Sequence, residues 1–547
     1  MTDAARGGIG RASAILASGT LVSRILGFVN ATVLAGAIGY IGAAADGFTL
    51  ATQIPNSIYA LIAGGLLSAV LVPQVVRAAT THEDGGQLYV NRIVTLGIVI
   101  FLLVATAATL AAPLLVRLYA QSGERGFTAE GIALATALAY WCLPQIFFYA
   151  LYSLLGQVLN ARGVFGPFTW APALNNVIAI IGIAVFIALF GLDPAHRDAA
   201  TWTPQMVALL GGTATLGIAV QALVLTLFWR RAGLTFRPNF RWRGVGLRRT
   251  GTAAAWVFGM VLLTQVAAIV ETRIGSAATG DASLSVLKYA WLIFMLPHSI
   301  VTVSIATAYF TRMSEHAAAG RLASVRDDLS AALRGILLIM VFATVALVPL
   351  SYPFGAFFGG SFRDVSAFAP VLVAYLVGLV PFTVLFLLQR VFYSLDDTRT
   401  VFFTQLLQSS LFVAGVLAVG LAPTAVIGIG IALVMSIAGT VQTIVTAALL
   451  RPRLGGLDGR RVLVRTAQYL AAAIPAGAVG VLVVWSLGGY TEGGFASSSR
   501  VGAILALAAA GLAMTLLYFG ILWLARNPEL RGFAAPILSR LRREPRE

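Results

Sequence analysis

The sequence predicts an all-α polytopic membrane protein with about 14 transmembrane helices. Of its 547 residues, 59% are hydrophobic and 11% are charged, and the mean hydropathy is +0.89. This composition leaves too little polar surface for a soluble protein of this size, and apolar runs of about 20 residues, the length that crosses a bilayer, recur along the chain. The single cysteine, Cys142, provides neither a disulfide framework nor a cysteine-based metal site.

An apolar window moved along the chain predicts the spans in order. They are 13–38, 48–76, 93–117, 131–158, 171–191, 205–229, 252–275, 284–309, 332–350, 367–393, 400–420, 424–449, 466–487 and 500–525. With the N-terminus placed in the cytoplasm, the inner segments carry 29 basic residues and the outer segments carry six. Because cytoplasmic loops are enriched in Arg and Lys, we expect both termini in the cytoplasm.

Two short motifs indicate an internal repeat. QIPNSI at 53–58, in the second span, resembles MLPHSI at 295–300, in the eighth, and the segments that follow Gln157 and Gln389 are also similar. Matches six spans apart in the same order predict two six-helix lobes in parallel orientation, although apolar helices also match by chance. The predicted domains are an N-terminal lobe (1–229), a basic cytoplasmic linker (230–249), a C-terminal lobe (250–450), accessory helices 13 and 14 (451–525) and a basic cytoplasmic tail (526–547).

The linker contains seven Arg residues interleaved with Phe236, Phe240 and Trp242. Basic and aromatic residues together can bind nucleic acid, but this segment follows a membrane span on the predicted cytoplasmic side. We therefore expect it to lie on anionic membrane lipids, and we expect no nucleic-acid partner.

Motifs for covalent chemistry are missing from the sequence. It has no phosphate-binding loop of the P-loop type, no HExxH zinc motif and no pair of acids on a soluble loop. These absences favour a transporter over an enzyme, with no cofactor and no metal site.

Two charges near the start of the chain are candidate site residues. Arg24 lies about six residues inside the first apolar run, where a cation needs an anionic or hydrated partner. It either faces a cavity or extends back to the cytoplasmic interface. Asp46 is either the counter-charge to a cation in a cavity between the first two spans or a lone acid in a short outer loop.

Prolines recur at matching places in the repeat. Pro55 and Pro297 interrupt the backbone hydrogen bonds of the second and eighth spans. With Gly64 and Gly65 they are candidate bends for a rocking motion, or else simply tolerated kinks.

The sequence resembles the MurJ (MviN) family of lipid II flippases, and its motifs look most like the actinobacterial branch. The resemblance covers essentially the whole chain. Its motifs are SGTLVSRILGF, AAADGF, QIPNSIYALIAGGLLSAVLVPQVVRA, VLNARGVFGPFTWAPALNNV, YAWLIFMLPHSIVTVSIATAYFTRMS and FYSLDDTRT.

The resemblance implies the fold of the multidrug/oligosaccharidyl-lipid/polysaccharide exporter superfamily, with two lobes around a central cavity and a groove at the last two helices. It also implies that lipid II moves from the inner to the outer leaflet of the bacterial cytoplasmic membrane by alternating access, in support of peptidoglycan synthesis. Arg24 corresponds to the Arg of the family's SRxLGF motif and Asp46 to the acid of its ADxF motif. A guanidinium is well suited to hold a diphosphate.

The sequence departs from the family where many members carry further charges. It has Asn30 and Tyr59 in place of Arg, and Trp291-Leu292 in place of Asp-Arg. The headgroup is then held by a reduced set of polar and basic groups, or the chain carries another polyprenyl-diphosphate-linked glycan or small molecule, or it serves as a non-transporting scaffold for wall-synthesis or division proteins. The expected cavity residues are Arg24, Asp46, Asn30, Gln53, Asn56 and Lys288.

Overall fold

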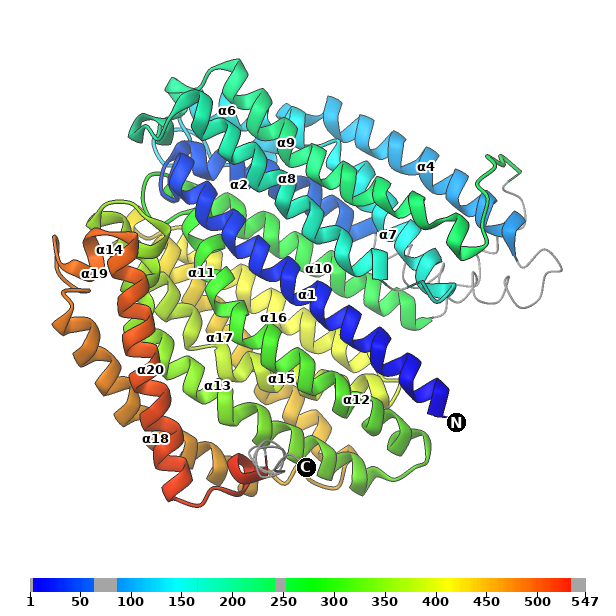
Figure 1. The fold of residues 1–547 in the computed structure, drawn as a ribbon, viewed down its shortest axis with the longest axis vertical. Coiled ribbons are helices and arrows are strands. Elements are labelled where there is room, and N and C mark those ends of the chain that lie inside the picture. Colours follow the sequence, from blue (N-terminus) through cyan, green and yellow to red (C-terminus); the bar gives the residue numbers. More distant parts are fainter. Residues whose placement is uncertain (1–2, 63–85, 165, 242–251, 533–547) are drawn as a thin grey trace, which may run out of the picture. The chain divides into compact units, whose positions relative to one another are not determined.

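The structure is a computed structural model that describes residues 3–62, 86–164, 166–241 and 252–532 (Figure 1). Within these ranges the regular structure is helical, apart from one isolated β-bridge between Ser122 and Phe127. Gly64 and Gly65 lie outside the described residues, as do the second part of the span predicted at 48–76 and parts of the linker and tail.

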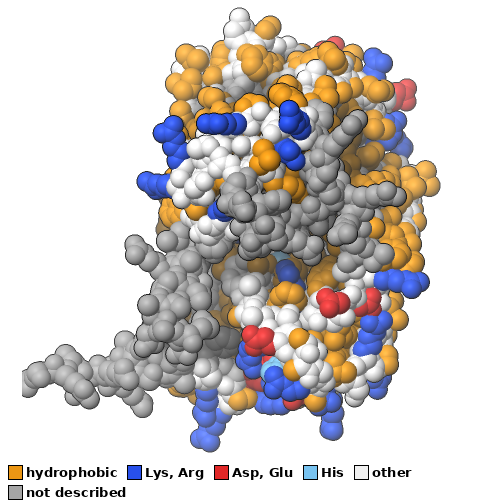
Figure 2. Space-filling model, turned by 90° about the vertical axis from the view of Figure 1, so that its right-hand side faces the viewer, with side chains coloured by type: hydrophobic (Ala, Val, Ile, Leu, Met, Phe, Trp, Pro, Cys, Tyr) orange, Lys and Arg blue, Asp and Glu red, His pale blue; other side chains and the backbone are white. Residues whose placement is uncertain are grey.

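The predicted fold class is confirmed. Among the described residues, 12 helices are long and apolar enough to cross a membrane, and a bent pair of helices brings the number to 13 if it counts as one span. Large apolar side chains such as Leu103 and Leu512 are more than 60% exposed in the interior of their helices, as expected where lipid replaces water. Hydrophobic side chains also make up much of the face drawn in Figure 2.

The chain divides into two compact units, Met1–Ser285 and Val286–Glu547. The longer helices of the first unit are α1 (Asp3–Ile38), α2 (Ala43–Ile62), α4 (Gln87–Leu110), α5 (Ala112–Tyr119), α6 (Ala129–Cys142), α7 (Gln145–Ala161), α8 (Gly166–Phe190), α9 (Pro204–Leu223) and α10 (Thr252–Gly275). The repeat assigns α10 to the second lobe, whereas in the structure α10 packs on α2 and α5 of the first unit. The division into six-helix lobes at residues 229 and 250 stays a prediction.

The second unit contains the remaining helices. They are α11 (Leu284–Pro297, which begins two residues before the boundary), α12 (Val303–Ala318), α13 (Leu322–Phe358), α14 (Phe362–Leu376), α15 (Leu379–Ser394), α16 (Thr398–Val419), α17 (Thr424–Arg453), α18 (Gly459–Ser486), α19 (Phe495–Ser498) and α20 (Arg500–Leu524). Helices α14 and α15 form the bent pair, with an angle of 41° between them. A π-helical turn, His298–Thr302, follows Pro297 and joins α11 to α12.

The accessory helices α18 and α20 pack against each other and against α13. The hydroxyl of Tyr518 on α20 donates to the carbonyl oxygen of Leu338 at 2.6 Å. The hydroxyl of Tyr490 donates to the carbonyl oxygen of Pro349 at 3.1 Å, a group that has no helical partner because Pro353 lacks an N–H. Both tyrosines therefore tie the accessory pair to the backbone of α13.

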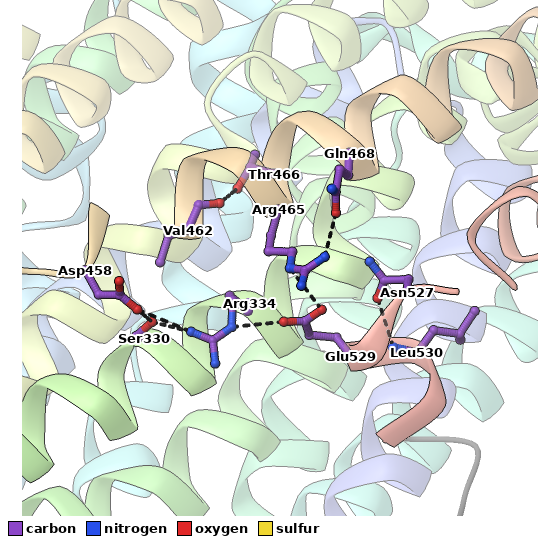
Figure 3. A network of polar contacts seen from close by, with 10 residues as sticks. All are labelled: Ser330, Arg334, Asp458, Val462, Arg465, Thr466, Gln468, Asn527, Glu529 and Leu530. Carbon is purple, nitrogen blue, oxygen red and sulfur yellow. Dashed lines mark hydrogen bonds and ion pairs between the residues drawn. The ribbon is translucent and has the colours of Figure 1, made fainter. Parts of the chain in front are cut away.

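A network of polar contacts connects α13, α18 and the segment after α20 (Figure 3). Arg334 on α13 donates to Glu529, which follows α20, with Nε and Oε1 3.0 Å apart, and its Nη1 lies 3.6 Å from Asp458, just before α18. Arg465 on α18 lies 3.5 Å from the second oxygen of Glu529. The side chains of Arg334 and Glu529 are only 11% and 12% exposed, so the charges are largely shielded from water.

Candidate functional site

A cavity of about 640 Å³ lies in the first unit beside Arg24. Three helices form it, namely α1, α7 and α8. Its lining residues are Thr20, Ser23, Arg24, Tyr152, Asn160, Phe168, Thr169 and Pro172.

Pro172 shapes the α8 side of this cavity. Because proline has no N–H, the carbonyl of Phe168 one turn earlier lacks its usual helical partner. The hydroxyl of Tyr152 on α7 donates to that carbonyl at 2.8 Å, and its ring stacks on Phe168 with the centroids 5.0 Å apart. Pro172 thus frees the carbonyl of Phe168 from the helix, and the hydrogen bond from Tyr152 to this carbonyl holds α7 against α8 at the cavity.

The α1 side is held by close contact with α8. The side-chain amide of Asn176 donates to the carbonyl of Ser23 at 3.0 Å, which fixes the backbone next to Arg24. One turn earlier, a Cβ atom on Gly19 would come within 2.9 Å of the Trp170 ring, so glycine is needed for this approach. These contacts hold the α1 backbone around Arg24 in place, and Arg24 itself is exposed.

Arg24 carries the only charge among the cavity's lining residues. Within the described part of the chain, its side chain makes no ion pair and no hydrogen bond. Hydroxyl groups of Thr20, Ser23 and Thr169 and the amide of Asn160 line the same space. An unpaired guanidinium among neutral hydrogen-bonding groups is an anion-binding arrangement, and its planar donors suit phosphate oxygens.

Asp46 lies in a different place, at the first turn of α2, and is fully buried. One carboxylate oxygen accepts a hydrogen bond from the hydroxyl of Ser283, and the other accepts from the backbone N–H of Ser285 at 2.9 Å. The hydroxyl groups of Thr49 and Ser285 lie 3.0 Å apart. These contacts join α2 to the start of α11 within the first unit.

The other predicted residues do not enter the Arg24 cavity. Gln53 lies on the same face of α2 as Asp46 and donates to the hydroxyl of Thr272 on α10 at 2.8 Å. Asn56 is exposed on α2, and Lys288 is exposed on α11 in the second unit. Asn30 on α1 has a buried Oδ1 with no hydrogen-bond partner in the described structure.

The predicted bends differ in their local structure. Pro55 lies inside the continuous helix α2, whereas Pro297 is the last residue of α11 and precedes the π turn. In the described ranges, no group of three or more His, Cys, Asp or Glu residues could hold a metal ion.

A family model described as "Lipid II flippase MurJ" matches residues 34–499. The chain belongs to the MurJ family. A probable lipid II flippase MurJ of Haemophilus influenzae is 28% identical over 403 residues, which are 70% of this chain and 75% of that protein. One of Rhizobium meliloti is 26% identical over 482 residues, which are 86% of each chain.

Solved structures show the same fold. A lipid II flippase MurJ in an inward closed conformation matches with a TM-score of 0.71 at 18% identity, over 96% of this chain and 99% of that one. An inward-facing multidrug resistance transporter of the MATE family matches with a TM-score of 0.62 at 16% identity, over 80% and 96%. These matches support the predicted superfamily fold.

Sequence reasoning missed five polar residues of the cavity of this MurJ family member, namely Thr20, Ser23, Tyr152, Asn160 and Thr169. Thr20 and Ser23 lie in the SGTLVSRILGF motif. Asn160 lies in the VLNARG motif, so the resemblance offered a signal for it. Thr169 lies further along the same motif, VLNARGVFGPFTWAPALNNV. Tyr152 has no comparable signal, because its place at the cavity depends on how α7 packs near α8.

Proposed function

We propose that the chain moves lipid II, a polyprenyl-diphosphate-linked glycan, from the inner to the outer leaflet of the bacterial cytoplasmic membrane by alternating access. The observation that carries the proposal is the unpaired Arg24 in a polar cavity of the first unit. On a membrane-spanning helix, an anion needs a charged and hydrogen-bonding partner, and Arg24 with its neutral neighbours offers both. Membership of the MurJ family supports the same substrate.

The remaining predicted residues fit accessory roles in this proposal. Gln53, Asn56, Asn30 and Lys288 would contact polar parts of the headgroup. Asp46 would help to restore the empty state through its link to the start of α11. Pro55 and Pro297 would provide bends for the change between inward and outward states. Anionic lipids and wall-synthesis or division proteins remain proposed partners.

Complementation tests the proposed transport. In a flippase-depleted bacterial strain, expression of the chain should restore growth and the accessibility of lipid II on the outer leaflet. Restored growth without outward lipid II would favour another polyprenyl-linked cargo. Rescue by a variant in which both Arg24 and Asp46 are neutralised would favour a scaffold and contradict the proposal.

The proposed orientation predicts opposite labelling of two exposed positions. Glu124 lies in a segment expected outside, and Ala323 lies in one expected in the cytoplasm. In a Cys142→Ala background, which removes the buried native thiol, Glu124→Cys should react with a membrane-impermeant thiol reagent in intact cells and Ala323→Cys only after lysis. The reverse pattern would overturn the proposed orientation of both termini.

A further inference from the structure

A second cavity, of about 230 Å³, lies wholly within the second unit. Helices α11, α14 and α15 supply one wall of it, and α16 and α17 supply the other. The two walls differ in chemistry, and neither contributes a charged side chain to the lining.

The first wall is aromatic. Trp291 stacks on Phe294 with the ring centroids 4.8 Å apart, and its ring meets Tyr375 at 5.5 Å and Phe382 at 6.0 Å. Tyr375 and Phe294 are buried, whereas Trp291 is half-buried and borders the cavity. Interlocked rings present a fixed apolar surface whose negative faces attract C–H groups of a ligand.

The second wall carries three carboxamide side chains. Gln442 Nε2 on α17 donates to Gln405 Oε1 on α16 at 3.3 Å, and Gln405 Nε2 donates to Gln408 Oε1 at 2.9 Å. Burying polar side chains in membrane-spanning helices costs free energy, so three neighbouring glutamines in two such helices indicate a structural or binding role. One such role is to hold α16 and α17 together.

Hydrogen bonds between α16 and α17 do not give every amide group of these three glutamines a good partner, as Gln408 shows. Its side chain is 7% exposed, and within the described structure its Nε2 donates only to the thioether of Met435, 3.6 Å away. A thioether is a weak acceptor, so a buried donor at the cavity wall lacks a good partner. A ligand hydroxyl or carbonyl oxygen would provide one. The side-chain amide of Gln389, which also lines the cavity, makes no hydrogen bond to any described residue.

We propose that this cavity binds one N-acetylated sugar ring of a lipid-linked glycan, an inference that rests on the proposed function. Carboxamides both donate and accept hydrogen bonds, as do the hydroxyl and acetamido groups of such a sugar. The opposite aromatic wall suits the apolar face of the ring. The absence of charge from the lining favours a neutral ligand over a phosphate or a peptide carboxylate. Since cavities that hold drug-sized ligands measure roughly 300–1,000 Å³, this one suits a single ring.

Paired probes test the inference with the full chain in lipid nanodiscs. The first probe is farnesyl diphosphate, and the second is the same lipid esterified with N-acetylglucosamine. The wild type should bind the glycosylated probe more tightly. In Gln408→Leu, which keeps the volume but removes the amide, affinity for the glycosylated probe should fall roughly two- to tenfold, while affinity for farnesyl diphosphate stays unchanged.

Gln221→Leu is the matched control, because Gln221 is a buried glutamine of the first unit, and it should preserve the difference between the probes. The inference fails if the wild type binds both probes with equal affinity, if the difference persists in Gln408→Leu, or if both affinities fall together in Gln408→Leu. The last result would mean that the glutamines only support the fold.

Failure of the proposed function is a separate result. It would appear as a wild type that binds neither probe, or as failed complementation.

Discussion

Arg24→Ala should abolish lipid II transport per molecule of protein, while Arg24→Lys should restore it only in part. A charge-assisted hydrogen bond to arginine contributes about 1.5–3 kcal/mol, so loss of the guanidinium should weaken substrate engagement roughly ten- to a hundredfold or more. Lysine restores the charge but not the planar pair of donors that matches a phosphate. The measurement is outer-leaflet lipid II divided by the amount of the variant in the membrane.

Arg125→Ala provides the matched control, because Arg125 is an exposed arginine of the loop between α5 and α6. It should transport like the wild type. If Arg24 merely extended to the membrane interface, lysine would replace it fully, and alanine would lower abundance more than activity per molecule. Full activity per molecule in Arg24→Ala would refute the role proposed for the cavity.

Arg334→Ala should cause the largest loss of stability among single substitutions in the polar network at the end of the accessory helices. Removal of Arg334 takes the closest cation from Glu529, which is shielded from water and keeps only Arg465, and it also removes the cation beside Asp458. Breaking one partner of a buried ion pair costs about 3–5 kcal/mol. For a unit of this size, the midpoint of thermal unfolding should fall by roughly 5–10 °C. The assay is thermal unfolding of the purified protein in detergent.

Arg326→Ala is the control for this loss of stability, because it removes an arginine from an exposed ion pair. Arg326 lies 3.5 Å from Asp327, whose side chain is 72% exposed. An exposed pair contributes about 0–1 kcal/mol, so the midpoint should hardly move. The double variant Arg334→Ala/Glu529→Ala should lose less stability than the sum of its single variants, because each single variant already loses the contact between these two side chains. Additive losses would show that the two side chains are not coupled.

Most spans were predictable because a bilayer demands a fixed apolar length. The spans predicted at 400–420 and 424–449 correspond to α16 and α17 within a few residues. The span predicted at 332–350 is much shorter than α13, because the first turns of α13 carry Arg326, Asp327 and Asp328, which a hydropathy window excludes. The span predicted at 131–158 consists of two helices that meet at Pro144.

The candidate site was only partly predictable. Arg24 stands out in the sequence because a cation inside an apolar run is unusual. Its cavity partner Tyr152 lies 128 residues further along the chain, and Asp46 is held by Ser283 and Ser285, more than 230 residues away. Neither pairing leaves a local pattern, because both depend on which helices pack together. The carboxamide wall was missed for the same reason, since Gln405 and Gln442 meet only across α16 and α17.

The position of Glu529 sets a practical limit on shortening or fusing this protein. Glu529 follows α20, which is the last of the described helices long enough to span the membrane, yet it contacts arginines of both α13 and α18. A chain cut at the end of α20 would keep every candidate span among the described residues and still lose the anion shared by Arg334 and Arg465. Reporter fusions intended to preserve the native unit should therefore be joined downstream of residue 529.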